Sequence, residues 1–92
     1  MSITIRFFAR FREMLGTDIL VEHGDGLFLT DLIRNVASGN KEGVDAIFDE
    51  EGNFREYVIL MRNRRRVDNR KASLVTASDG DEIAVFPPVA GG

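Results

Sequence analysis

The chain has 92 residues, of which 43% are hydrophobic and 29% are charged, and these are the proportions of an ordinary folded protein, so disorder is not expected. This length supports one domain with a single core. The formal net charge of -3 and the pI near 5.1 remove the general electrostatic reason for binding nucleic acid or an acidic membrane surface, and we therefore expect protein partners.

The sequence contains no cysteine, so the chain can form no disulfide and offers no thiolate nucleophile or sulfur ligand of its own. Its first residues alternate between apolar and polar instead of forming a basic region followed by an apolar one. No apolar run approaches the roughly 18 residues that a membrane-spanning helix needs. We therefore expect a cytoplasmic protein that does not bind a membrane.

The first half of the chain predicts a strand, a helical turn, a second strand and a helix. Residues 2–8 alternate with a period of two, which places Ile3, Ile5 and Phe7 on one buried face. Good helix formers at 9–15 end at Gly16, and residues 18–23 are rich in strand formers, so they predict a hairpin partner for the first strand.

The clearest helix follows these strands. Thr30 is its expected N-cap, Asp31 lies in its first turn and Gly39 stops it. A second short helix is expected at 41–48. The acidic stretch at 49–53 predicts a solvated turn, and its spacing lacks the pattern of a calcium-binding loop.

The second half of the chain begins with an apolar run at 57–61, which we interpret as a strand buried on both faces. The basic cluster from Arg62 to Arg66 follows it, interrupted only by Asn63. Two interpretations stay open for this cluster: a solvated hairpin end, or a contact for an acidic protein surface. RNA is a weaker alternative, because the net charge is negative and no aromatic residue is interleaved to stack on a base.

Residues 79–82 predict a turn that starts the last strand at Ile83. The acids in this turn have no His, Lys or Cys nearby in sequence, so we assign them no catalysis. His23 is the single histidine and makes a poor metal ligand without a partner. Because phosphate-binding and nucleophile motifs are also missing, the chain does not resemble a self-sufficient enzyme.

The most informative stretch is the end of the chain. The last strand runs into two prolines, which forbid a helix, and the chain closes with two glycines and a free carboxylate. A terminal glycine pair alone is only suggestive, but the preceding strand and prolines make it specific. We interpret the last six residues as a functional tail, namely Pro87, Pro88, Val89, Ala90, Gly91 and Gly92.

Both ends of the chain resemble the MoaD family, the small subunit of molybdopterin synthase, and related small archaeal modifier proteins. Residues 5–13 resemble the family's first strand, residues 29–32 its helix start, and residues 79–92 its closing signature. The resemblance implies an α+β, ubiquitin-like β-grasp fold: a mixed sheet of four or five strands packed on one main helix. The domain is then 1–86, and residues 87–92 form a flexible, extended C-terminal tail.

The middle of the chain departs from that family. Members often carry an Asn-Gly turn after the third strand, whereas here Asn63 is followed by Arg64. Because a side chain tolerates a left-handed backbone poorly, we expect this turn to be longer or looser than usual. Ala77 also stands where a larger apolar residue is expected.

The resemblance also implies a function for Gly92. An ATP-dependent, ubiquitin-activating-like adenylyltransferase adenylates its carboxylate, and sulfur then displaces AMP to give a thiocarboxylate. The sulfur is donated inside the large subunit of molybdopterin synthase; the chain itself binds no cofactor or metal, and ATP is used by the activating partner. The same adenylated Gly92 could instead be joined to lysines of target proteins, and an interaction module with an incidental tail is a third alternative.

The residue types of the tail suit such a role. Pro87 and Pro88 keep it extended, and residues 87–92 reach roughly 20 Å at about 3.3 Å per residue. Gly91 and Gly92 can pass a narrow channel because they lack a Cβ atom.

Strand parity predicts a partner-binding patch beside the tail. If the first and last strands are parallel neighbours, Phe8 and Phe86 emerge together on the outer face of the sheet, where an exposed aromatic pair favours protein docking. The alternative is that Phe11 or a loop buries both rings.

Overall fold

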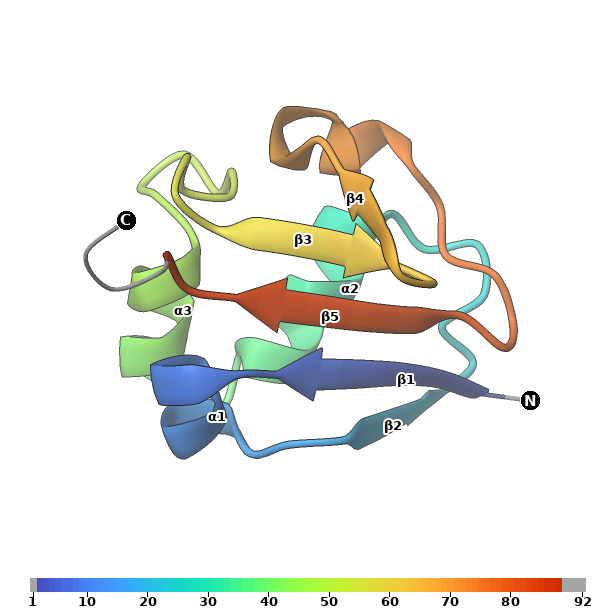
Figure 1. The fold of residues 1–92 in the computed structure, drawn as a ribbon, viewed down its shortest axis with the longest axis horizontal. Coiled ribbons are helices and arrows are strands. Elements are labelled where there is room, and N and C mark those ends of the chain that lie inside the picture. The colour runs from blue at the N-terminus through green and yellow to red at the C-terminus, as the bar shows by residue number, and fades with distance from the viewer. Residues whose placement is uncertain (1, 89–92) are drawn as a thin grey trace.

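The computed structural model describes residues 2–88, which form one mixed sheet with helices on one side (Figure 1). Five strands are ordered β2-β1-β5-β3-β4 across the sheet. In chain order the elements are β1 (Ser2–Phe7), α1 (Ala9–Leu15), β2 (Ile19–Glu22), α2 (Leu29–Ala37), α3 (Lys41–Ile47), β3 (Ile59–Arg62), β4 (Arg65–Val67), the 3-10 helix η1 (Asn69–Leu74) and β5 (Glu82–Phe86).

The sheet is mixed because its two central strands run in the same direction. β1 pairs in parallel with β5, with Ile5 opposite Ile83, while β2 pairs antiparallel with β1. β3 is antiparallel to both β5 and β4. Two predictions are confirmed: β2 is the antiparallel partner of β1, and the first and last strands are parallel neighbours.

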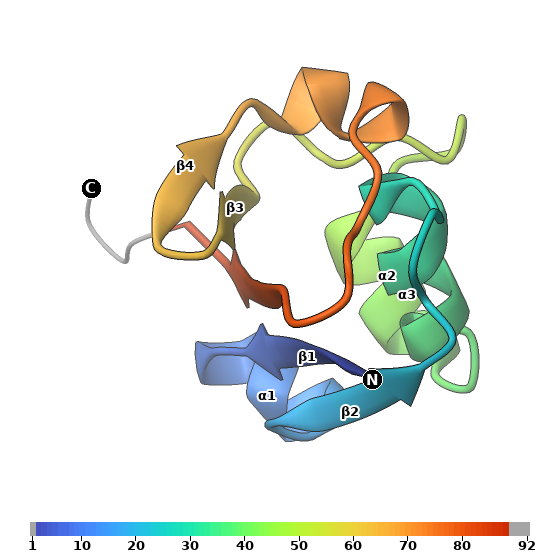
Figure 2. The same ribbon diagram turned by 90° about the vertical axis from the view of Figure 1, so that its right-hand side faces the viewer.

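The core lies between the sheet and the helices. In Figure 2 the helices α2 and α3 lie on one side of the sheet, which we call the inner face. The alternation in β1 and β5 directs their apolar residues to that side, where they pack against α2 and α1. Fully buried members include Ile3, Ile5, Phe7, Phe11, Leu29, Leu32, Ile33, Ile47, Val58, Leu60, Ile83 and Val85. Within residues 2–88, none of the helices has the length and apolar character needed to span a bilayer.

The start of α2 differs from the expectation that Thr30 is its N-cap. The helix begins at Leu29, Phe28 occupies the capping position without a side-chain hydrogen bond, and Thr30 is only 5% exposed. The Leu29 N–H has no acceptor within the helix, and it donates instead to the Val75 carbonyl at 2.8 Å. A β-bridge from Phe28 to Thr76 therefore sets the helix start, while Asp31 lies in the first turn as expected.

The short helix expected near residue 41 is confirmed as α3, and Asn40 connects it to α1. The Asn40 Oδ1 accepts a hydrogen bond from the Gly43 N–H at 2.9 Å, which caps α3. Its Nδ2 donates to the Met14 carbonyl at 2.7 Å. In the acidic turn that follows α3, Asp49 accepts hydrogen bonds from the N–H groups of Glu51 and Asn53, so this carboxylate stabilises the turn.

The prediction that the third strand is buried on both faces is wrong. Val58 and Leu60 are buried on the inner face, whereas Ile59 and Met61 are half-buried on the opposite, outer face. The reason is the layer arrangement: the helices cover one face of the sheet only (Figure 2). An antiparallel strand in such a sheet needs only one buried face.

The expected longer or looser turn after β3 is also wrong. Arg62 pairs with Arg65, so the turn has two residues, Asn63 with φ 50° and Arg64 with φ 70°. Asn63 is anchored to the start of β5: its Nδ2 donates to Asp81 Oδ1, and its Oδ1 accepts from the Glu82 N–H, both at 2.9 Å. These bonds hold the tight turn without the usual glycine.

Arg64 is nevertheless in a backbone conformation that favours glycine. We expect Arg64→Gly to raise the free energy of unfolding by about 0.5–1 kcal/mol. Glycine adopts the left-handed backbone conformation at this position without the steric cost that a side chain adds. Arg66→Gly in β4 is the matched control and should lower it, since glycine weakens a strand. Urea denaturation measures both, and an Arg64→Gly protein less stable than the wild type would contradict the expectation.

Candidate functional site at the tail exit

The C-terminal tail begins at one end of the sheet. β5 ends at Phe86, and Pro87 and Pro88 then follow outside any helix or strand. The remaining tail residues, Val89, Ala90, Gly91 and Gly92, lie outside the described residues. Their predicted roles therefore stay predictions, and the described site is the surface from which the tail departs.

Phe8 and Phe86 stack on each other at this end of the sheet. Their ring centroids are 4.3 Å apart with an interplanar angle of 11°, and both side chains are half-buried. The parallel pairing of β1 and β5 brings them together, and the Phe8 N–H donates to the Val85 carbonyl at 3.1 Å. Phe11 lies in the core instead of covering them. The pair is thus accessible, and its partner-binding role stays a prediction.

The stacked rings form part of an apolar groove of about 690 Å³, which we call the tail-exit groove. Its lining residues are Phe8, Ala9, Arg10, Ile59, Met61, Phe86, Pro87 and Pro88. Ile59 and Met61 were missed as site residues because the third strand was expected to be buried on both faces. The alternation of Val58 and Leu60 with Ile59 and Met61 is the sequence signal that could have identified them.

The corner between β1 and α1 shapes one wall of the tail-exit groove. Phe8 is extended, and Ala9 then takes a left-handed conformation with φ 52°. This reversal starts α1 directly after the strand, so that Phe8 faces the groove while Phe11 enters the core. A small residue at position 9 suits this corner, because a β-branched side chain would meet a larger steric penalty there.

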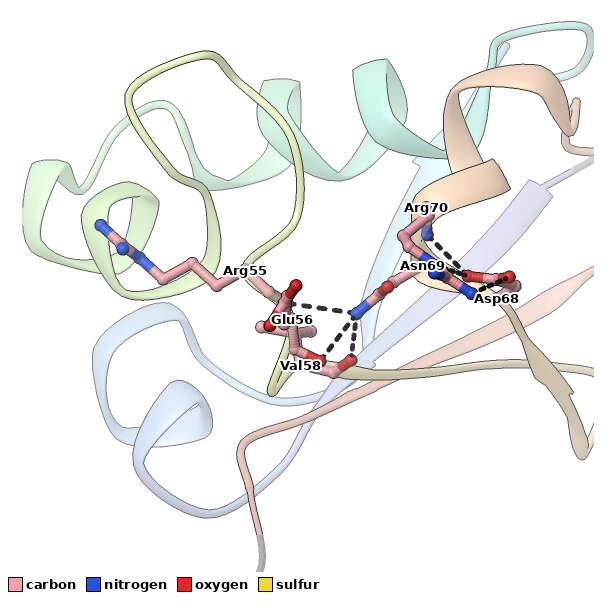
Figure 3. Close-up of polar contacts among 6 residues, drawn as sticks. All are labelled: Arg55, Glu56, Val58, Asp68, Asn69 and Arg70. Carbon is pink, nitrogen blue, oxygen red and sulfur yellow. Dashed lines mark hydrogen bonds and ion pairs between the residues drawn. The ribbon is translucent and has the colours of Figure 1, made fainter.

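Asn69 fixes the segment that leads into β3 (Figure 3). Its Nδ2 donates to the carbonyls of Arg55, Glu56 and Val58 at 3.1, 3.2 and 2.8 Å. Next to it, Arg70 donates to Asp68 through Nε and Nη2, and these hydrogen bonds lower the pKa of the Asp68 carboxyl below its usual range. The start of β3, and with it Ile59 in the groove, is therefore held from η1.

We expect Asn69→Ala to lower the free energy of unfolding by about 1–3 kcal/mol, because part-buried carbonyls lose their donor. Asn69→Asp keeps the shape but removes both donors, so its loss should be at least as large. Ser73→Ala, an exposed change on the same η1, serves as the control and should stay within about 0.5 kcal/mol of the wild type. Equal stability of the Asn69→Ala and Ser73→Ala proteins by urea denaturation would contradict this role.

The acidic groups near β5 are structural. Asp81 is 7% exposed, and its Oδ2 accepts from the Ser78 N–H at 2.8 Å and lies 3.5 Å from Arg62 Nε. His23 is exposed at the end of β2, as expected. Residues 2–88 contain no cluster of three or more His, Cys, Asp or Glu side chains placed to hold a metal ion. The described site therefore consists of an apolar surface beside the departing tail.

The sequence pattern of the ThiS family matches residues 5–92, which include both the β1 end of the groove and the final glycine. The chain belongs to the ThiS family. Relatives named as a molybdopterin synthase subunit and as an archaeal modifier are both similar to the chain, so the resemblance to these proteins is confirmed.

Two relatives and one solved structure are similar to this chain over most of its length. The chain is 33% identical over the full length of both chains to small archaeal modifier protein 3 of Haloferax volcanii. It is 31% identical to the molybdopterin synthase sulfur carrier subunit of Aedes aegypti, over 98% of this chain and 88% of that one. The crystal structure of SAMP1 from Haloferax volcanii matches with a TM-score of 0.82 and 24% identity, covering all of both chains. The predicted ubiquitin-like β-grasp fold is confirmed.

Proposed function

We propose that this protein is a sulfur carrier whose C-terminal Gly92 receives sulfur as a thiocarboxylate and donates it in molybdopterin biosynthesis. The observation that carries the proposal is the parallel pairing of β1 with β5, which places the end of β5 and the start of the tail, Pro87 and Pro88, in the tail-exit groove. The family match extends through residue 92 and supports the same role for the terminus. The chain then acts as the non-catalytic small subunit, and partners perform the chemistry.

The chemistry begins with activation, because a carboxylate is a poor electrophile. The Gly92 carboxylate attacks the α-phosphorus of ATP on an adenylating partner, and pyrophosphate leaves. Hydrosulfide supplied through that partner then attacks the acyl carbon, and the C–O bond to AMP breaks. The resulting thiocarboxylate is an anionic sulfur nucleophile, like a thiolate, and passes its sulfur to a precursor pterin in the large synthase subunit. Hydrolysis returns the carboxylate.

The tail-exit groove offers an apolar docking surface to the adenylating partner and then to the large synthase subunit. Its wall is formed mainly by apolar side chains, including the Phe8 and Phe86 rings, which can be desolvated at low cost. The tail begins at Pro87 and Pro88 in the lining of the same groove, so a partner docked there contacts the start of the tail. Docking and delivery are thus coupled at one end of the sheet.

A second candidate function is protein modification, in which a target lysine attacks the adenylated Gly92 and forms an isopeptide bond. The full-length similarity to small archaeal modifier protein 3 favours it. Both functions use the same activated terminus. They differ in the nucleophile that releases AMP: sulfur in the carrier and a lysine amine in the modifier.

Mass spectrometry on protein from the native cells separates the two functions. The carrier predicts free protein in which one terminal oxygen is replaced by sulfur, and the modifier predicts lysines joined to Gly92. Because Lys71 is the last basic residue, trypsin leaves residues 72–92 on a modified lysine. A protease that cleaves after Val89 or Ala90 gives a short glycine remnant instead. Absence of both products from cells making molybdenum or tungsten cofactor would overturn the proposal.

A further inference from the structure

The β3–β4 hairpin carries three exposed arginines, Arg64, Arg65 and Arg66, which we call the basic hairpin. Among residues 2–88, none of the three forms an ion pair with a carboxylate. The neighbouring arginines are different: Arg62 lies 3.5 Å from Asp81, and Arg70 lies 3.2 Å from Asp68. In a chain of net charge -3, this is a local concentration of uncompensated positive charge.

Among these three arginines, Arg64 gives the clearest indication that the side chain serves a purpose other than stability. It occupies the left-handed region with φ 70°, where glycine would cost less, and its exposed side chain makes no stabilising contact within the described residues. Charged side chains can protect an edge strand from unwanted pairing, and β4 is an edge strand. That role explains charge within β4 but not an arginine in the turn. A strained residue without a structural benefit indicates a use for the side chain itself.

The basic hairpin lies at the opposite end of the sheet from the tail. Arg62 pairs with Ile83 near the start of β5, whereas Ile59 pairs with Phe86 at its end. Figure 1 shows the β3–β4 turn at one side of the sheet and the end of β5 at the other. Arg66 pairs with Met61 and so belongs to the outer face, while no described strand covers the free edge of β4.

We propose that the basic hairpin binds an acidic segment of a partner protein, centred on the turn at Arg64 and Arg65, while Arg66 lies beside Met61 at the border of the tail-exit groove. Guanidinium groups pair with carboxylates through two parallel hydrogen bonds, and three of them along a turn and an edge strand match a short run of Asp and Glu. Nucleic acid fits less well. The hairpin offers no aromatic ring on which a base could stack.

This location has a consequence that rests on the proposed carrier function. A partner segment held at Arg64 and Arg65 leaves Phe86 and Pro87 uncovered, because the β3–β4 turn and the end of β5 lie at opposite ends of the sheet. One protein can therefore retain the carrier while a second enzyme reaches Gly92. The hairpin contact itself does not depend on what Gly92 carries.

Fluorescence anisotropy with the full chain tests the proposal, using a labelled glutamate-rich peptide and a labelled single-stranded RNA of equal net charge. We expect the peptide to bind more tightly than the RNA, and its binding to weaken with added salt. Arg64→Gly and Arg65→Gln should each weaken peptide binding about two- to fivefold, the loss typical of one exposed ion pair. Arg64→Gly is expected to be more stable than the wild type, so its loss of binding cannot be attributed to unfolding.

Arg12→Gln is the matched control, because Arg12 is exposed on α1 and its removal changes the net charge equally. It should leave peptide binding unchanged. If Arg12→Gln lost as much peptide affinity, the effect would come from the net charge of the protein instead of the basic hairpin, and the proposal would be overturned. Tighter binding of the RNA, or no peptide binding at low salt, would overturn it as well. None of these readouts involves Gly92, so they are independent of the sulfur-carrier test.

Discussion

Replacing Gly91 with phenylalanine is expected to reduce adenylation of the chain by its activating partner at least about a hundredfold while leaving the fold intact. Within residues 2–88 every strand and every core residue lies before residue 87, so we expect the fold to tolerate the substitution. A side chain at position 91 should prevent the carboxylate from reaching the nucleotide, and a misplacement of about 1 Å can cost that much in rate. Pyrophosphate release from ATP measures the effect.

Two controls define the origin of this loss. Leu74→Phe adds the same ring at an exposed position on η1, and it should be adenylated normally. Gly91→Ala adds only one methyl group, so its loss should be intermediate. Unchanged thermal unfolding of Gly91→Phe would show that the fold is intact. Normal adenylation of that variant would refute the idea that the terminus enters a narrow channel.

Replacing Phe86 with alanine is expected to weaken binding to the adenylating partner about ten- to a hundredfold, as loss of a central aromatic anchor does at protein interfaces. The Phe86 ring forms both the stack with Phe8 and part of the groove wall. Loss of the stack should also lower the free energy of unfolding by about 0.5–1.5 kcal/mol. Titration calorimetry gives the affinity, and urea denaturation gives the stability.

Leu20→Ala is the matched control for this change. Leu20 is 62% exposed and lies on β2, at the far edge of the same sheet and outside the tail-exit groove. Its truncation also removes an exposed apolar side chain but should leave partner affinity unchanged. If Leu20→Ala and Phe86→Ala weakened binding equally, the groove would not be the docking surface.

Local sequence patterns were sufficient to predict the frame of the fold. The alternation of Ile3, Ile5 and Phe7 identified the buried face of β1. The same alternation in β5 placed Phe86 on the opposite face of the sheet from Val85. Because parity and parallel pairing together determine which side chains share a face, the Phe8–Phe86 stack could be anticipated. The tail was equally visible, since Pro87, Pro88 and the closing glycines are read directly from the chain.

The incorrect expectations share one physical cause, namely contacts between residues distant in sequence. Thr30 has the right chemistry for a cap, but the bridge between Phe28 and Thr76 starts the helix earlier. The turn at Asn63 is tight because Asp81 and Glu82 hold the asparagine side chain. Neither contact can be predicted from the helix or turn propensities of neighbouring residues.

The groove was incomplete in the sequence-based prediction for a related reason. An apolar run such as 57–61 does not reveal whether a helix covers one or both faces of its strand. The helices cover only the inner face, so Ile59 and Met61 became part of the site instead of the core. Predicting the groove therefore required knowing which face of the sheet the helices cover, whereas predicting the tail did not.

Thiol labelling of the native protein tests most directly the claim that Gly92 becomes a sulfur nucleophile. The chain contains no cysteine, so a thiol-alkylating reagent has no side-chain thiol to modify. Methionine oxidation adds a nearly equal mass but no thiol, and labelling excludes it. The sulfur-carrier function predicts one label per chain, located at the Gly92 carboxyl group by fragmentation, and its loss when Gly92 is deleted. Protein from sulfur-replete cells that carries an unmodified terminus and takes up no label would contradict it.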